Sequence, residues 1–234
     1  QCFDACLRDI SKDSNIFSDT DNWLRSAYIY MFGAYPDRIT IQMEGSYMNK
    51  DFAKKLSENG IQLSSANSIN IGRLVPQIAY YVYAYLKLLE NGDIDDNEKI
   101  NVCVPTGNFG NILAAYIAKQ MGLPVNKLIC ASNENKVLFD FFENGVYDRN
   151  RKFILTSSPS MDILISSNLE RLIYLSCGGD GEYVKKLMQE LANGGKYTVT
   201  PAMKDFMKDF VGGYADEKKN FAGIKSLYDS TGYI

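Results

Sequence analysis

The stretch KINVCVPTGNFGNILAAYIAKQMGLPVNKLICAS, residues 99 to 132, is the most informative part of this chain about its fold. Its first seven residues are rich in β-branched and apolar types and end at a proline, which predicts a strand. Residues 111 to 121 predict a helix that Gly122 and Pro124 terminate. A second apolar run, 127 to 132, predicts the next strand. Because strand, helix and strand at this spacing form a crossover unit, we expect an α/β fold with an open, mostly parallel sheet and flanking helices.

The turn TGNFGN, residues 106 to 111, lies between the first strand and the helix. In open parallel sheets, ligands bind at the carboxyl ends of the strands. Gly107 and Gly110 let the backbone approach a ligand closely, and the positive end of the following helix favours an anion. The turn has neither the GK[ST] of a P-loop nor a GxGxxG fingerprint. It therefore predicts a phosphate site of another kind, the alternative being a plain turn with Asn111 as the helix N-cap.

A second polar stretch, SSANSINIGR, covers residues 64 to 73 and precedes a long apolar helix. Serine and asparagine side chains donate to oxyanions, and the Arg73 guanidinium can hold a phosphate in bidentate fashion. The residues alone leave open whether this stretch is an anion site or a loop that caps the helix. We expect that helix to start near Leu74, with Pro76 in its first turn, where a missing N–H costs nothing.

The rest of the sequence predicts further alternation of helices and strands, followed by a helical C-terminal part. We expect a helix at 136 to 144, a strand KFILT at 152 to 156, and a helix start at SSPSMD with Ser158 as N-cap and Asp162 complementing the helix dipole. Earlier, RITIQME (38 to 44) predicts a strand. Three helices are expected near the C-terminus, at 181 to 192, 201 to 211 and 216 to 229. The expected domains are a poorly matched segment 1–60, an α/β core 61–178 and a helical portion 179–234.

Composition excludes several classes of function. A formal charge of −3 argues against a nucleic-acid or anionic-membrane surface, and the apolar stretch 74 to 89 is shorter than the roughly 20 residues of a membrane span. The chain has no histidine, which removes Ser-His-Asp triads and His-based metal sites, and we expect no metal. Its five cysteines show no CxxC spacing, which indicates a reducing, cytoplasmic compartment.

Several long motifs in order give the chain a family resemblance. SSANSINIGRLVPQ, VPTGNFGNILAAY, KLICASNEN, GVYDRNR and SPSMDILISSNLERL together resemble the threonine synthase family, from about Gly60 to Leu175 and more loosely to Ile234. This family consists of pyridoxal 5′-phosphate enzymes of fold type II, the tryptophan synthase β-like fold. The resemblance implies conversion of O-phospho-L-homoserine and water to L-threonine and phosphate.

The resemblance also implies roles for particular residues. The cofactor phosphate would be held by the glycine-containing turn, namely Gly107, Asn108, Phe109, Gly110 and Asn111. The position of Asn108 in the family also lies near the cofactor ring or the substrate phosphate. The substrate's own phosphate would be held by the second polar stretch, namely Asn67, Ser68 and Arg73.

The lysine that holds the cofactor as a Schiff base in this family lies well upstream of the SANSIN motif. We expect it before Gln1, because Gln1 starts without an initiator methionine and no matching lysine segment is found. Lys50, in NKDFA, resembles it superficially but lies only 17 residues before Asn67 and fits an exposed helix start. We therefore expect a fragment with no catalytic residue of its own, inactive alone, whose partners are O-phosphohomoserine and the remainder of the same enzyme. Residues 11 to 48 match the family poorly and are candidates for an insertion.

Three alternatives remain at this stage. A non-catalytic, degenerate module of the same fold would retain the phosphate turn without a lysine. A serine/threonine dehydratase or a β-replacement enzyme of fold type II is disfavoured by Arg73, because the substrates of these enzymes carry no phosphate. A nucleotide-binding domain predicts an acidic residue about 20 positions after the glycine turn, where Leu128 to Ala131 are apolar.

Overall fold

The computed structural model describes residues 40–42, 58–59, 62–64 and 70–233. The chain divides into two compact units, Gln1–Asn67 and Ser68–Ile234. The three-part division expected from the sequence stays a prediction.

In the first unit, two short strands pair in parallel. β1 (Thr40–Gln42) lies beside β2 (Gln62–Ser64), with Thr40 opposite Gln62. The strand predicted at 38 to 44 is confirmed over β1.

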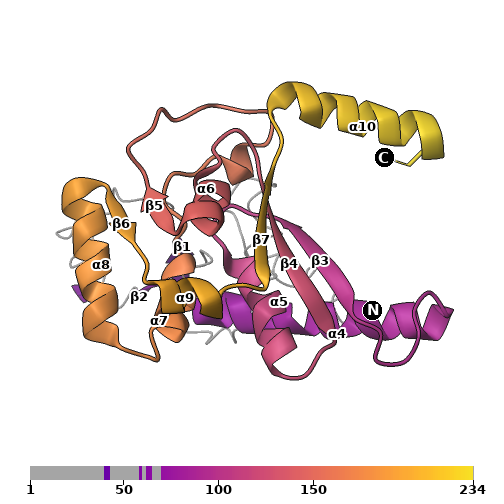
Figure 1. The fold of residues 1–234 in the computed structure, drawn as a ribbon, viewed down its shortest axis with the longest axis horizontal. Helices are drawn as coiled ribbons and strands as arrows, with labels where there is room; N and C mark the ends of the chain where they lie inside the picture. The colour runs from indigo at the N-terminus through magenta and orange to yellow at the C-terminus, as the bar shows by residue number, and fades with distance from the viewer. Residues whose placement is uncertain (1–39, 43–57, 60–61, 65–69, 234) are drawn as a thin grey trace. The chain divides into compact units, whose positions relative to one another are not determined.

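The second unit alternates helices and strands along most of its length (Figure 1). In chain order its elements are α4 (Ile71–Asn91), β3 (Ile100–Pro105), α5 (Gly110–Gln120), β4 (Val125–Ser132), α6 (Val137–Asn144), β5 (Val146–Asp148), the 3-10 helix η1 (Pro159–Met161), α7 (Leu169–Ser176), α8 (Gly181–Gly194), β6 (Lys196–Thr198), α9 (Pro201–Phe206), β7 (Phe210–Tyr214) and α10 (Glu217–Thr231).

A parallel three-stranded sheet forms the centre of this unit. Its order is β3-β4-β7, and the three strands lie side by side in Figure 1. Ile129 of the middle strand is opposite Cys103 on one side and Val211 on the other. The predicted α/β class with its parallel sheet and flanking helices is therefore confirmed. β5 and β6 form a separate antiparallel pair.

The hydrophobic core lies between the sheet and the helices α5 and α6. Leu128 and Cys130 of β4 are fully buried, as is Ile112 of α5. Aromatic rings also pack in the core: those of Phe142 and Phe210 stack with their centroids 5.3 Å apart. Each large apolar side chain buried in this way contributes roughly 1.5–3 kcal/mol to folding. This packing fixes the start of α5 relative to the sheet.

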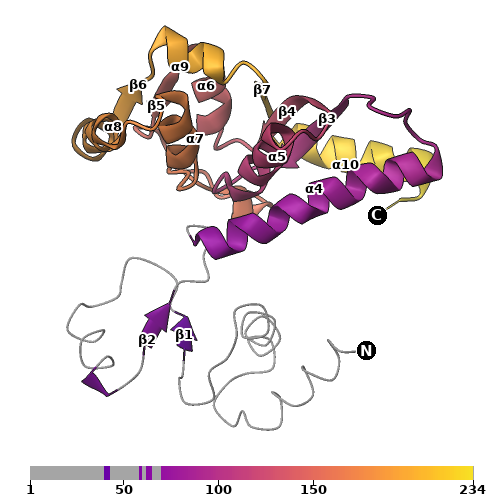
Figure 2. The same ribbon diagram turned by 90° about the horizontal axis from the view of Figure 1, so that it is seen from below.

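The long helix α4 lies along α5 (Figure 2). It begins earlier than predicted, because the side chain of Asn70 caps it by accepting a hydrogen bond from the Gly72 N–H at 2.9 Å. Pro76 is consequently the sixth residue of the helix and not part of its first turn, so that prediction is wrong. The buried side of α4 includes Leu74 and Tyr85, whose hydroxyl donates to the Glu98 carbonyl at 3.0 Å.

The strand predicted at 152 to 156 is wrong, because these residues form a loop whose backbone bonds to side chains. The Asn135 side chain pairs with both backbone groups of Ile154. The Asp162 carboxylate accepts from the Thr156 N–H at 2.9 Å. Asp162 lies at the C-terminal end of the short helix η1, so its predicted role at a helix N-terminus is also wrong. Ser158 does hold the N-cap position of η1, but its side chain makes no capping bond.

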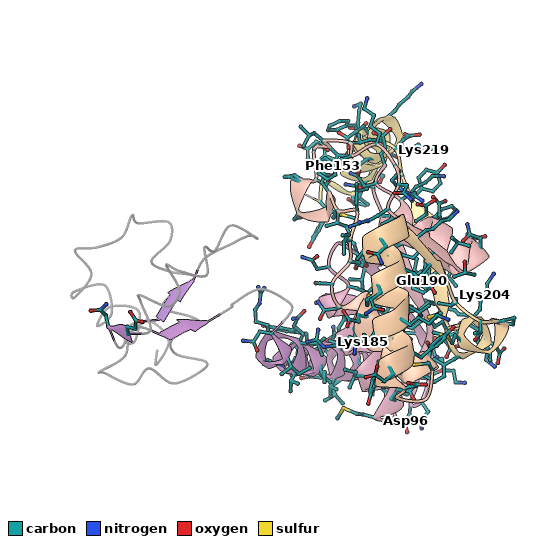
Figure 3. All side chains as sticks on the ribbon, turned by 90° about the vertical axis from the view of Figure 1, so that its left-hand side faces the viewer. Asp96, Phe153, Lys185, Glu190, Lys204 and Lys219 are labelled. Carbon is teal, nitrogen blue, oxygen red and sulfur yellow. The ribbon has the colours of Figure 1, made fainter. Side chains whose placement is uncertain are left out.

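Past residue 180, the predicted helices are present as α8, α9 and α10, with two strands among them. Helix α8 buries Val184 and Leu187 and carries Lys185 and Glu190 on its outer side (Figure 3).

The helix expected to reach residue 211 ends at Phe206 instead, and β7 follows it. β7 packs so closely on α6 that position 212 requires a glycine: a Cβ there would lie 3.0 Å from the Phe139 Cα. In the described part of the chain, no helix combines the length and apolarity that crossing a membrane requires.

Candidate functional site

The predicted phosphate turn lies at the carboxyl end of β3 and leads directly into α5. Phe109 is the N-cap residue of α5 and adopts the left-handed conformation, with φ of 63°. Its side chain is 1% exposed and packs against the rings of Phe142 and Phe210 at 6.0 and 5.6 Å. Asn111 is already inside the helix, so the alternative in which it caps α5 is wrong. Phe109 therefore anchors the turn in the core, and only its backbone is available to a ligand.

The carbonyl groups of the turn are held on one side by the segment that precedes α7. The Ser166 hydroxyl donates to the Gly107 carbonyl at 2.8 Å. The Asn108 carbonyl accepts from both the backbone N–H and the Nδ2 of Asn168, at 3.1 and 2.9 Å. In a trans peptide the N–H points opposite to the carbonyl of the same unit. The N–H groups of Asn108 and Phe109 therefore point away from this segment.

The backbone N–H groups of the turn are available as donors. Among the described residues, the N–H groups from Gly107 to Asn111 donate no hydrogen bond. The last of them belong to the first turn of α5, whose N–H groups have no partner within the helix. The helix also places about half a positive charge at this end. The turn is thus a row of oriented donors suited to an anion.

A cavity of about 190 Å³ opens on this turn, and Arg73 and Gln77 of α4 form its other wall. Its volume is below the roughly 300 Å³ at which pockets for whole small-molecule ligands begin, so it suits phosphate groups of ligands rather than a whole ligand. The structure thus brings Arg73 and the turn to one cavity, although they lie more than 30 residues apart in sequence. Asn67, Ser68 and Lys50 lie outside the described residues.

The side chain of Asn111 is held by α4. Its Nδ2 donates to the Gln77 side chain at 3.0 Å, and the Tyr81 hydroxyl donates to both its Oδ1 and its backbone carbonyl. Like any tyrosine, Tyr81 is protonated at neutral pH, and burial raises its pKa further, to about 12. Gln77 and Tyr81 were not predicted from the sequence. The signal was present, since Arg73, Gln77 and Tyr81 follow one another at intervals of four, which places them on one face of a helix.

Gly107 is required by a close approach between two backbones. A Cβ at this position would lie 2.7 Å from the carbonyl oxygen of Ser160 in η1. The motif SPSMDILISSNLERL therefore lies against the turn, through Ser160, Ser166 and Asn168. The motif was identified from the sequence, but these three residues were given no role, because each contacts a residue more than 50 positions away.

Other reactive groups lie apart from this cavity. In the part of the chain that the structure describes, no three His, Cys, Asp or Glu side chains gather to hold a metal ion. Cys103, Cys130 and Cys177 are free thiols. Burial raises the pKa of the Cys130 thiol to about 12, so it is unreactive at neutral pH.

Comparison with known proteins gives a consistent set of relatives. Threonine synthase-like 1 of Homo sapiens is 47% identical over 191 residues, which cover 80% of this chain and 26% of that protein. Threonine synthase of Saccharomyces cerevisiae is 40% identical over 190 residues, covering 77% and 36%. The crystal structure of pyridoxal-phosphate-bound threonine synthase from Brucella melitensis superposes with a TM-score of 0.72 at 39% identity, covering 80% of this chain and 38% of that one. No family model matches the chain. The chain spans about a quarter of the length of the threonine synthase-like relatives.

Proposed function

This chain belongs to the threonine synthase family, and we propose that it is the part of a threonine synthase that binds two phosphate groups, one of pyridoxal 5′-phosphate and one of O-phospho-L-homoserine. One observation carries the proposal: Arg73 and the turn Gly107–Asn111 line the same cavity at the carboxyl end of β3. The reaction of the whole enzyme would convert O-phospho-L-homoserine and water to L-threonine and phosphate.

The turn fits the phosphate of the cofactor. Its N–H groups are oriented by bonds to Gly107 and Asn108 carbonyls, and the start of α5 adds positive potential. Gly107 leaves no side chain between the turn and Ser160. These backbone groups would anchor pyridoxal phosphate, which when bound supplies an electron sink for the reacting carbon atoms.

Arg73 is proposed to hold the phosphate of the substrate. A guanidinium presents two parallel N–H donors, which match two oxygen atoms of a phosphate. Fixing this group would orient the leaving phosphate and stabilise its developing charge. The described residues that line the cavity include no lysine, so we assign covalent attachment of the cofactor to another part of the enzyme.

Calorimetric titration of the chain tests the proposal. Pyridoxamine 5′-phosphate and pyridoxamine are suitable probes, because neither carries an aldehyde that would react with surface lysines. We expect the phosphorylated compound to bind at least ten times more tightly, and inorganic phosphate to compete with it. Equal affinity for the two compounds, or no binding of either, would contradict a phosphate site in this chain.

A further inference from the structure

The segment from Leu164 to Asn168 supports the phosphate turn from outside the cavity. Ser166 and Asn168 contact the Gly107 and Asn108 carbonyls. Both residues are buried: Ser166 is 6% exposed and Asn168 is 0% exposed. A buried polar group that loses its partner costs about 1–3 kcal/mol, so these bonds resist rotation of the two peptide units.

Tyr147 of β5 orients this segment in turn. Its hydroxyl donates to the Leu164 carbonyl at 3.1 Å and accepts from the Ser166 N–H at 2.8 Å. The ring is 1% exposed and stacks on Tyr197 at 5.3 Å between centroids. The hydroxyl is protonated at neutral pH, as in any tyrosine, and burial raises the pKa of Tyr147 further, to about 12.

The amide of Asn168 is also oriented. The Arg171 guanidinium donates to its Oδ1, which leaves Nδ2 to donate to the Asn108 carbonyl. A guanidinium has no acceptor, so the reverse orientation of the amide would place two donors against each other.

We propose that Ser166 and Asn168, with Tyr147 behind them, are positioning residues that aim the N–H groups of Asn108 and Phe109 at the phosphate of a bound ligand. This inference rests on the proposed function. Donors that are already oriented need no reorganisation when the ligand binds, so affinity for a phosphate depends on this support. None of the three residues lines the cavity.

The test uses the complete 234-residue chain and single-atom deletions. Ser166→Ala and Tyr147→Phe each remove one oxygen. The matched controls are Ser176→Ala, whose hydroxyl donates to the Ile173 carbonyl within α7, and Tyr197→Phe, whose ring stacks on that of Tyr147. Urea unfolding measures the stability of all four variants. Calorimetry measures the dissociation constant for pyridoxamine 5′-phosphate, and the phosphorus NMR shift of the saturated complex reports the donors around the phosphate.

We expect Ser166→Ala and Tyr147→Phe to weaken binding by roughly threefold to tenfold, the value of one hydrogen bond, and to move the phosphorus resonance. The two control variants should leave the dissociation constant and the phosphorus resonance unchanged, even if Tyr197→Phe lowers stability as much as Tyr147→Phe does. If all four variants bind like the wild type, or if weaker binding simply follows lower stability in the controls too, the positioning role is wrong while the proposed function stands. A wild-type chain that does not prefer pyridoxamine 5′-phosphate to pyridoxamine would overturn both.

Discussion

Asn135 forms with Ile154 the two hydrogen bonds that a neighbouring strand would form. Its Nδ2 donates to the Ile154 carbonyl at 2.7 Å, and its Oδ1 accepts from the Ile154 N–H at 3.0 Å. Asn135 is 4% exposed, so water does not compete well for these bonds. One side chain thereby holds the loop that leads to Ser158, Ser160 and the support of the phosphate turn.

Replacing Asn135 with alanine should lower the free energy of unfolding by about 2–4 kcal/mol, because two backbone groups of Ile154 lose their partners. Asn126→Ala is the control, since Asn126 is exposed and should change stability by less than about 0.5 kcal/mol. Urea unfolding followed by circular dichroism gives both values. Equal effects at the two positions would show that the loop does not depend on Asn135.

The carboxylate of Asp162 makes stability depend on pH. Burial acts to raise its pKa, but hydrogen bonds from Thr156, Asn133 and Asn135 outweigh it and hold the pKa below the ordinary 3.8. Because the folded pKa is the lower one, this stabilisation is complete above the unfolded pKa and is lost as pH falls through the folded value.

Unfolding free energy should therefore decrease as the pH falls below about 4, and Asp162→Asn should remove part of that decrease. Urea unfolding at a series of pH values measures both slopes. The same slope in the variant and the wild type would mean that Asp162 keeps its ordinary pKa in the folded chain.

Gly107→Ala should destabilise the chain by roughly 1–3 kcal/mol, because the new methyl group would overlap the Ser160 carbonyl. Gly181→Ala is the matched control: its added Cβ would point into open space, and alanine should stabilise the helix by up to about 1 kcal/mol. Thermal unfolding of the two variants should thus shift in opposite directions. A neutral Gly107→Ala would show that the two backbones can separate freely.

Local patterns predicted the part of the fold that depends on local interactions. The unit β3, α5 and β4 was predicted because β-branched runs, a helical periodicity and the Gly122–Pro124 ending all act over a few residues. β7 was missed because Gly212 and Gly213 have low strand propensity, and the strand exists through its pairing with β4 and its contact with α6. The KFILT segment has strand propensity, but its backbone bonds to the side chains of Asn135 and Asp162 instead of to a neighbouring strand.

The site shows the same division. The row of N–H donors followed from a glycine turn before a helix, so Gly107 and Gly110 were identified from the sequence pattern, whereas Asn108 came from the family resemblance. The support from Ser166, Asn168 and Tyr147 could not be, since a hydroxyl and an amide that bond to a carbonyl about 60 residues away leave no periodic signal. The sequence also did not predict that the side chain of Phe109 lies in the core, or that the side chain of Asn111 bonds to α4.

Arg73→Ala should separate the two proposed phosphate sites. Removing the guanidinium should weaken binding of O-phospho-L-homoserine to the complete enzyme by tenfold or more, because charged hydrogen bonds contribute about 1.5–3 kcal/mol. The cofactor should remain bound, which its visible absorbance reports. Arg73→Lys is the second variant, and it should restore binding only in part, since lysine lacks the bidentate geometry. Loss of the cofactor in Arg73→Ala would mean that the two sites are assigned in reverse.

Backbone amide NMR of the nitrogen-15-labelled chain, titrated with pyridoxamine 5′-phosphate, observes the proposed donors themselves. We predict that the largest downfield proton shifts fall on the amides from Gly107 to Asn111, with little change at α8, where Lys185 and Glu190 face solvent. If those amides do not move while resonances elsewhere do, the turn at the end of β3 is not the phosphate site.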